Sequence, residues 1–203
     1  MRLLPSGSTA LLVELDELDD VLALYAALAD DPPDGVVDVV PAARTVLLVT
    51  DPARTTLSAV ADAVHRTTPK PGGQRTGDAV ELPVHYDGAD LEELAEQLQL
   101  TGEELVQRHT GAEWTVAFCG FAPGFGYLTQ PGAAWDVPRR ATPRTKVPAG
   151  SVALAGEFSG VYPRESPGGW QLVGRTDVAV FDLSREPAAL LRPGTRVRFV
   201  AVP

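Results

Sequence analysis

Apolar residues in the first 86 positions follow two different periods. Two stretches repeat them every three or four residues, which predicts helices at residues 18–28 and 57–64. Four shorter stretches are continuous and rich in β-branched residues, which predicts strands at residues 9–15, 36–40, 46–50 and 80–86. The order β-α-β-β-α-β is that of a ferredoxin-like α/β domain. Pro83 restricts the last strand to a sheet edge or a strand start, because proline has no backbone N–H.

The rest of the chain begins with two helical segments and continues as strands. The apolar face of residues 91–98 predicts one helix, with Asp90 at its N-cap. Thr101 and Glu104 have the spacing of a capping box, which predicts a second helix that ends at Gly111. Strands are predicted at residues 114–119, 152–155, 171–173, 178–183 and 196–202. Such short strands predict a small β-barrel or sandwich with one large loop system.

These patterns predict an α+β fold of two domains. We expect a small ferredoxin-like α/β domain at residues 1–79 and a β-barrel domain at residues 80–203, with the strand near residue 80 able to serve both. The Pro/Gly-rich residues 68–74 predict a mobile loop before that strand. With 203 residues, of which 44% are hydrophobic, the chain can bury a substantial core.

Composition excludes several functional classes. A formal net charge of −10 argues against a general nucleic-acid binder and against docking on anionic lipid. Cys119 is the single cysteine, which excludes an intrachain disulfide and a cysteine-based zinc site. The first residues form no apolar leader, and no apolar run reaches the roughly 18 residues of a spanning helix. We therefore expect a cytoplasmic protein that acts on a small molecule.

Residues 120–176 stand out as a basic segment shaped by glycine and proline. They contain six Lys/Arg and three Asp/Glu, a net charge of +3, whereas the rest of the chain carries −13. Glycine lets the backbone approach a ligand closely, and proline fixes a loop before the ligand arrives. A basic segment of this kind in an acidic protein predicts a site for an anion.

His109 and three cations are the main candidates for chemistry. His109 ends a capped helix, where it either shuttles a proton or carries a charge that the helix dipole favours. Arg140, Arg144 and Lys146 can share one face of an extended chain and hold a carboxylate, a phosphate or carboxybiotin. A solvated basic loop that pairs with the acidic first half is an equally good interpretation.

Other motifs limit the kinds of ligand and reaction that the sequence can support. Residues 123–127 lack the lysine of a P-loop and the spacing of a dinucleotide site. Residues 166–170 predict a tight turn whose backbone N–H groups can face an anion. Cys119 is expected to be a buried, inert thiol, and Ser151 lacks a nucleophile elbow. We find no set of residues with the spacing of a metal site or a catalytic triad.

Several spaced motifs resemble the family of 5-oxoprolinase B subunits, also called Kip-type kinase inhibitors or allophanate hydrolase subunit 1. They are Gly-Phe-x-Pro-Gly-Phe-x-Tyr-Leu at residues 120–128, Pro-Arg-x-x-Val-Pro-Ala-Gly-Ser-Val at residues 143–152, Tyr-Pro at residues 162–163, Ser-Pro-Gly-Gly-Trp at residues 166–170 and Gly-Arg-Thr at residues 174–176. One position departs from the pattern. Phe158 stands where the family commonly has a glutamine, which removes a polar amide.

The resemblance implies a cyclophilin-like β-barrel and a bacterial complex. The B subunit would pair with the C subunit (PxpC, KipA-like), and the A subunit (PxpA, LamB/YcsF-like) would complete the opening of 5-oxoproline to L-glutamate. ATP is expected to bind to the assembled complex. His109 and Arg144 are the expected catalytic residues. The expected substrate contacts are Phe121, Pro123, Gly124, Phe125, Arg140, Gly150, Ser151, Tyr162, Gly168, Gly169 and Trp170.

Three functions remain open from the sequence. The first is one component of an ATP-hydrolysing 5-oxoprolinase, inactive alone because the chain has no nucleotide loop. The second is a Kip-type inhibitor of a sensor histidine kinase. The third is a carboxyltransferase or allophanate hydrolase-like subunit, which would require a biotin carrier. Self-association in the absence of the partner is a further expectation.

Overall fold

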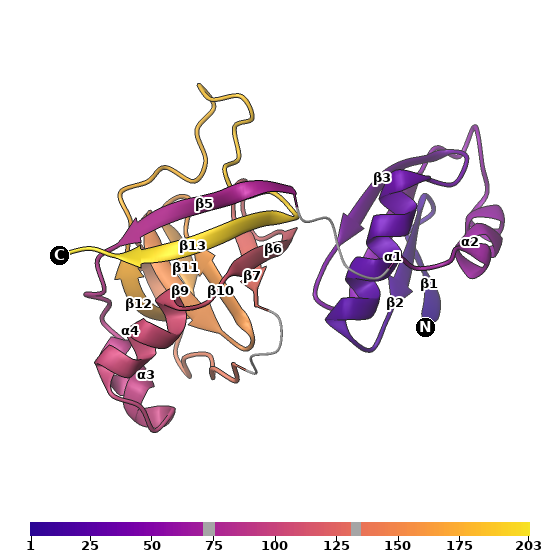
Figure 1. Cartoon of the computed structure of the whole chain (residues 1–203). Helices are drawn as coiled ribbons and strands as arrows, with labels where there is room; N and C mark the ends of the chain where they lie inside the picture. The colour runs from indigo at the N-terminus through magenta and orange to yellow at the C-terminus, as the bar shows by residue number, and fades with distance from the viewer. Residues whose placement is uncertain (71–75, 131–134) are drawn as a thin grey trace. The chain divides into compact units, whose positions relative to one another are not determined.

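The computed structural model describes residues 1–70, 76–130 and 135–203, and of residues 76–78 only the backbone (Figure 1). The chain forms two compact units, Met1–Gln74 and Arg75–Pro203. The mobile loop expected at residues 68–74 falls partly outside the described residues. Among the described residues, no helix is long and apolar enough to cross a membrane.

The first unit is a four-stranded antiparallel sheet with two helices, in the strand order β1-β2-β4-β3. Its elements are β1 (Arg2–Ser6), β2 (Ala10–Glu14), α1 (Leu18–Asp30), β3 (Val36–Pro41), β4 (Thr45–Thr50) and α2 (Leu57–Arg66). Apolar residues of both helices, such as Leu24 and Val60, pack with Val13 and Leu48 of the sheet in one core. The apolar faces that the helical period predicts for α1 and α2 are therefore buried in this core.

One predicted strand belongs to the other unit. The strand predicted at residues 80–86, which we expected to be able to serve both domains, lies in the barrel unit, where β5 (Thr76–Val84) pairs in parallel with β13 (Thr195–Ala201). The place beside β2 is taken by β1, in which Leu3 lies opposite Val13. The turn at Gly7, with φ of +66°, lets these two sequence neighbours form a hairpin. The expected strand order is therefore wrong for its last strand.

The second unit is a nearly closed barrel of seven strands, in the order β12-β9-β10-β7-β6-β13-β5. The further strands are β6 (Trp114–Cys119), β7 (Gly126–Thr129), β9 (Ser151–Ala155), β10 (Phe158–Val161) and β12 (Gln171–Arg175). The two edge strands meet where His85 and Arg175 exchange backbone hydrogen bonds, each 2.9 Å long. The predicted class, α+β with a β-barrel domain, is confirmed.

Two short helices pack on the barrel. They are α3 (Leu91–Gln97) and α4 (Gly102–Thr110), and they follow β5 in the chain (Figure 1). The Thr101 side chain accepts a hydrogen bond from the Glu104 N–H, and the Glu104 carboxylate accepts one from the Thr101 N–H. The predicted capping box is confirmed, and it begins α4 at the expected residue.

The Gly/Pro segment contains more regular structure than expected. Besides β7 and β10, it forms a separate two-stranded sheet of β8 (Arg144–Val147) and β11 (Ser166–Gly168). The strand predicted at residues 178–183 is wrong, because only an isolated bridge between Phe181 and Ala189 forms there. These differences arise because short strands in Gly/Pro-rich sequence depend on partners that local patterns do not reveal.

Candidate functional site

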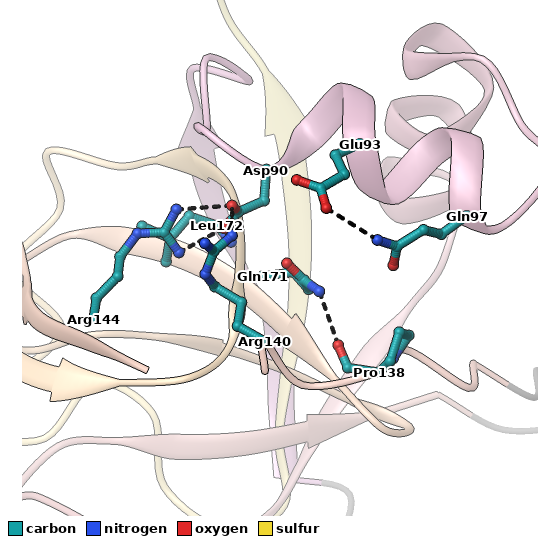
Figure 2. A network of polar contacts seen from close by, with 8 residues as sticks. All are labelled: Asp90, Glu93, Gln97, Pro138, Arg140, Arg144, Gln171 and Leu172. Atoms are coloured by element: carbon teal, nitrogen blue, oxygen red, sulfur yellow. Dashed lines mark hydrogen bonds and ion pairs between the residues drawn. The ribbon is translucent and has the colours of Figure 1, made fainter. Parts of the chain in front are cut away.

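Asp90 is the centre of a buried ionic network at the start of α3 (Figure 2). Its carboxylate is 2% exposed and accepts two hydrogen bonds from Arg144, of 2.7 and 2.8 Å. Arg140 donates a third at 2.5 Å, and the backbone N–H of Leu172 donates a fourth at 2.7 Å. The predicted N-cap residue therefore bonds to the loop and to β12, and its side chain makes no capping hydrogen bond.

This network contains more positive than negative charge. Burial by itself would raise the pKa of Asp90, but the hydrogen bonds from Arg144 and Leu172 and the charges of Arg144 and Arg140 hold it below its usual value. Asp90 in turn raises the pKa of Arg144. Two guanidinium groups on one carboxylate leave one positive charge uncompensated within these three residues. The Nε of Arg140 is buried without a hydrogen-bond partner.

The structure brings together two of the three cations that we expected on one face. Arg140 and Arg144 converge, whereas Lys146 is 76% exposed and pairs with Glu165 at 3.2 Å. The anion between the two arginines is a carboxylate of the chain itself. A ligand carboxylate would have to compete with Asp90 for the Arg144 fork.

His109 lies in the core of the barrel unit, 1% exposed. Its Nδ1 is 2.6 Å from the Tyr86 hydroxyl, and its Nε2 is 2.9 Å from the Ser159 hydroxyl. The imidazole ring stacks on Phe199 at a centroid distance of 4.3 Å. The backbone carbonyl of His109 accepts a hydrogen bond from Trp114 Nε1. A neutral imidazole satisfies both hydroxyl partners, because it has one donor and one acceptor nitrogen.

Burial lowers the pKa of His109 to about 3. The expectation that the helix dipole favours a charged His109 is therefore wrong, since desolvation in the core outweighs the dipole. Burial also raises the pKa of Tyr86, so that its hydroxyl remains a donor at neutral pH. No hydrogen bond joins His109 to the Asp90 network among the described residues. The catalytic roles of His109 and Arg144 remain predictions.

Most of the expected substrate contacts gather around Tyr162. Phe125 lies edge-on to Tyr162 and to Trp170, with centroids 5.3 Å apart in both cases. Phe121 stands edge-on to Tyr162 at 6.1 Å. A side chain at Gly168 would collide with the Tyr162 hydroxyl at 2.2 Å, so that glycine permits the approach. The carbonyl of Gly169 accepts a hydrogen bond of 2.9 Å from the N–H of Arg140.

The glycine turns of the basic segment serve chain packing. Gly124 has a φ of +82° and lies against Phe181, and Pro123 before it is exposed. Gly150 has a φ of +80°, and a side chain there would meet the carbonyl oxygen of Thr176 at 2.3 Å. Ser151 follows as a buried residue of β9. These turns are filled by protein atoms and do not fit a phosphate cradle.

The remaining candidates, Cys119 and a metal site, show no sign of reactivity or of metal binding in the described part of the chain. Burial raises the pKa of Cys119 to about 11, and its Sγ contacts the carbonyl of Leu191 at 3.4 Å. The raised pKa agrees with the inert thiol that we expected, whereas the side chain is half-buried and not fully buried as predicted. Among the described residues, no three His, Cys, Asp or Glu side chains are grouped to hold a metal ion.

Sequence reasoning missed the partners of both candidate catalytic residues. Ser159 and Tyr86 come from distant parts of the chain, and no local pattern links them to His109. Asp90 was noticed only as a helix cap, because Asp before an apolar run is typical of that role. No local signal separates Asp90 from the neighbouring acids Asp87, Glu92 and Glu93, so its cationic partners could not be predicted from the chain.

Comparison with known proteins relates this chain to a family. A sequence model described as carboxyltransferase domain, subdomain C and D, matches residues 1–191. The chain is 36% identical over 204 residues to the 5-oxoprolinase B subunit of Escherichia coli O157:H7, covering 96% of this chain and 93% of that protein. It is 47% identical over 126 residues to the 5-oxoprolinase B subunit of Bacillus subtilis (strain 168), covering 61% and 52%.

Solved structures share the fold. The crystal structure of TTHA0988 superposes with a TM-score of 0.78 at 38% identity, covering 96% of this chain. The conserved uncharacterized protein PH0987 from Pyrococcus horikoshii gives 0.59 at 31% identity, covering 99% of this chain and 97% of that one. The K. lactis urea amidolyase gives 0.76 at 19% identity, which supports the fold alone. The chain spans about half of the B. subtilis relative (52%) and only 40% of TTHA0988.

Proposed function

The chain belongs to the carboxyltransferase domain family of subdomains C and D, and from this membership we propose that it is the B subunit of a 5-oxoprolinase complex. The observation that carries the proposal is its 36% identity to the E. coli 5-oxoprolinase B subunit over nearly the full length of both chains. Carboxyl transfer is less well supported, because the urea amidolyase resemblance is 19% identical and concerns the fold.

The proposed reaction opens the five-membered lactam of 5-oxoproline to L-glutamate. An unstrained lactam does not open spontaneously, and ATP hydrolysis would supply the driving force. Phosphorylation of the lactam oxygen would activate the ring carbon for water, after which the ring C–N bond breaks and a second water releases phosphate. The balanced result is one L-glutamate, one ADP and one phosphate from one ATP and two waters.

The described residues of this chain supply only part of that chemistry. The glycine turns are filled by Phe181 and Thr176, so that they do not fit the ATP phosphates. His109 is buried and neutral, with both ring nitrogens bonded within the core. We therefore propose that ATP binds to the assembled complex, on partners of the C and A types, and that this chain contributes to binding 5-oxoproline.

An ATP-coupled turnover assay tests the proposal. The chain would be purified alone and together with the products of neighbouring genes that resemble the A and C subunits, and glutamate release from 5-oxoproline would be measured. We expect ATP-dependent glutamate only from the assembled complex. An assembled complex that hydrolyses ATP but releases no glutamate from 5-oxoproline would contradict the assignment.

A further inference from the structure

The segment between β12 and β13 carries the most exposed large apolar side chain of the described residues. Leu183, which is 84% exposed, lies in the turn enclosed by the bridge between Phe181 and Ala189. Figure 1 shows this segment extending beyond the strands of the barrel. A single exposed leucine is ordinary in a flexible loop, but hydrogen bonds fix the backbone around this one.

Arg185 holds this loop in one conformation from within. Its guanidinium donates hydrogen bonds of 2.9 to 3.3 Å to three backbone carbonyls of the loop, those of Ala179, Pro187 and Ala188. The carboxylate of Asp182 accepts hydrogen bonds from the N–H and the hydroxyl of Ser184, at 2.9 and 2.7 Å. Leu183 is therefore presented on a preorganised turn, so that little conformational entropy is lost when a partner covers it.

A second exposed apolar side chain lies on a turn that contacts this loop. Phe121 is 57% exposed, and its φ of +65° is held by a hydrogen bond of 2.7 Å from the Ala122 N–H to the Gly120 carbonyl. Three residues further on, a side chain at Gly124 would meet the Cβ of Phe181 at 2.5 Å, so the two segments touch there. The two most exposed large apolar side chains of the described barrel unit thus belong to two hydrogen-bonded turns in direct contact.

The charge around the two turns favours a basic partner. Residues 177–187 contain three Asp/Glu and one Lys/Arg, a net charge of −2, and residues 119–126 contain no charged side chain. Apolar anchors surrounded by acidic groups match an apolar pocket with a basic rim on another protein. The same charge opposes an anionic lipid surface, and it opposes a two-fold contact in which the turns of two identical copies face each other.

We propose that the turns of Phe121 and Leu183 are the surface through which this chain docks on a subunit of the C type. The partner would receive the two side chains in an apolar pocket rimmed by Lys or Arg. The choice of partner rests on the proposed function, under which this chain is one subunit of a complex. Exposed apolar side chains on preorganised turns are suited to anchor such an interface, because they enter a pocket without rearrangement of the backbone.

Binding of the purified chain to a C-subunit homologue from the same genome tests this surface, by titration calorimetry without substrate. Leu183→Ser should weaken binding by about tenfold, as for truncation of a central interface residue. Phe121→Asn should weaken binding by a smaller factor, and asparagine tolerates the positive φ of the turn. Val37→Ser is the matched control with unchanged affinity, because Val37 is a 59% exposed apolar residue of β3 in the other unit. Unfolding midpoints show whether each variant remains folded.

Equal affinities of wild type and Leu183→Ser, equal losses in Leu183→Ser and Val37→Ser, or no binding by the wild type would overturn the docking surface. So would self-association of the chain, detected by light scattering, that Leu183→Ser abolishes while the affinity for the partner stays unchanged. Normal binding by Leu183→Ser in a complex that releases glutamate refutes the surface and leaves the proposed function. Loss of binding in Leu183→Ser, when the wild-type complex releases no glutamate from 5-oxoproline, refutes the function and leaves the surface.

Discussion

At the scale of single residues, Asp90 explains why two arginines of the basic segment lie where they do. Its carboxylate joins the start of α3 to the loop of Arg140, to β8 through Arg144 and to β12 through Leu172. A charge that is removed from water in this way stabilises the fold only while its partners are present. The network therefore has a structural role. A functional test of Arg144 must distinguish a loss of stability from a loss of ligand binding or activity.

Arg144→Ala should lower the free energy of unfolding by about 2 kcal/mol, less than the ~3–5 kcal/mol typical of breaking a buried ion pair, because Arg140 and the Leu172 N–H still hold Asp90. Arg144→Lys should recover only part of this loss, since an ammonium group cannot bond both carboxylate oxygens as the planar fork does. Urea denaturation at neutral pH measures both.

The control for this experiment is Arg164→Ala, which should change stability by less than about 1 kcal/mol, as for exposed side chains. If Arg144→Ala and Arg164→Ala had the same small effect, the Asp90 network would not stabilise the fold. The double variant Asp90→Asn with Arg144→Ala adds a second check, because its loss should be smaller than the sum of the two single losses.

His109 should make the protein sensitive to mild acid. Its pKa is lowered to about 3 in the folded state, whereas an unfolded histidine titrates near 6.5. The unfolded state therefore binds the proton first, so that the stability is fully present above about pH 6.5 and falls by up to about 1.4 kcal/mol per pH unit down to about pH 3. Denaturation midpoints between pH 7 and pH 4 measure this slope.

His109→Gln should reduce the slope over that pH range, although it also costs stability because the packing on Phe199 changes. The exposed residue His65 supplies the control, and His65→Gln should leave the slope unchanged. A slope that is the same in wild type and His109→Gln would contradict the burial of a neutral histidine. Asp90, whose pKa is lowered, adds its own loss only at lower pH, as its carboxylate becomes protonated.

At the scale of elements, the helices follow local sequence more closely than the strands. The capping box of Thr101 and Glu104 begins α4 where the spacing predicts it, because both hydrogen bonds involve groups within one turn. In contrast, β8 and β11 form only by pairing with each other across roughly 20 residues of chain, Ser166 opposite Val147. Such pairing has no local signature in a Gly/Pro-rich segment.

Thr101→Ala should destabilise the barrel unit by about 1 kcal/mol, the usual cost of removing an N-cap side chain. Glu103→Ala is the matched control in the same helical turn, since the Glu103 carboxylate accepts a hydrogen bond from Gln107 and takes no part in the cap. It should cost no more than about 0.5 kcal/mol. Thermal unfolding followed by circular dichroism measures both, and equal losses would show that the cap does not set the stability of α4.

At the scale of the whole molecule, the chain divides its apolar residues between two units with separate cores. The barrel unit carries the Asp90 network and the buried His109 with its two hydroxyl partners. It also contains a second core cluster, which includes Phe125, Tyr162 and Trp170. The candidate chemistry of the chain is thus concentrated in one of its two units.

The purified chain alone should release glutamate from 5-oxoproline only at the background rate, because the turns at Gly124 and Gly150 are filled by protein atoms and His109 is buried and neutral. Co-expression with a homologue of the C subunit should give a complex that co-purifies, and size-exclusion chromatography with light scattering would detect it. Steady turnover by the isolated chain, or a monomer that stays separate after co-expression, would contradict this expectation.

Features that depend on neighbouring residues were predictable from the chain alone. The two helical periods of the first unit, the capping box of α4, strand β6 and the inert Cys119 were all predictable, because periodicity, caps and composition act within a few residues. The family motifs, which are also read along the chain, indicated the family that the comparisons establish.

The folded structure determines which groups from distant segments meet. It placed residues 80–84 in the barrel sheet alone, because their parallel pairing with β13 joins segments that are far apart in the chain. It gave Arg144 an internal partner in Asp90 and enclosed His109 between Tyr86 and Ser159. Charge and hydrogen-bonding capacity belong to residue types, but whether they are used inside the protein or remain for a ligand depends on contacts between distant segments.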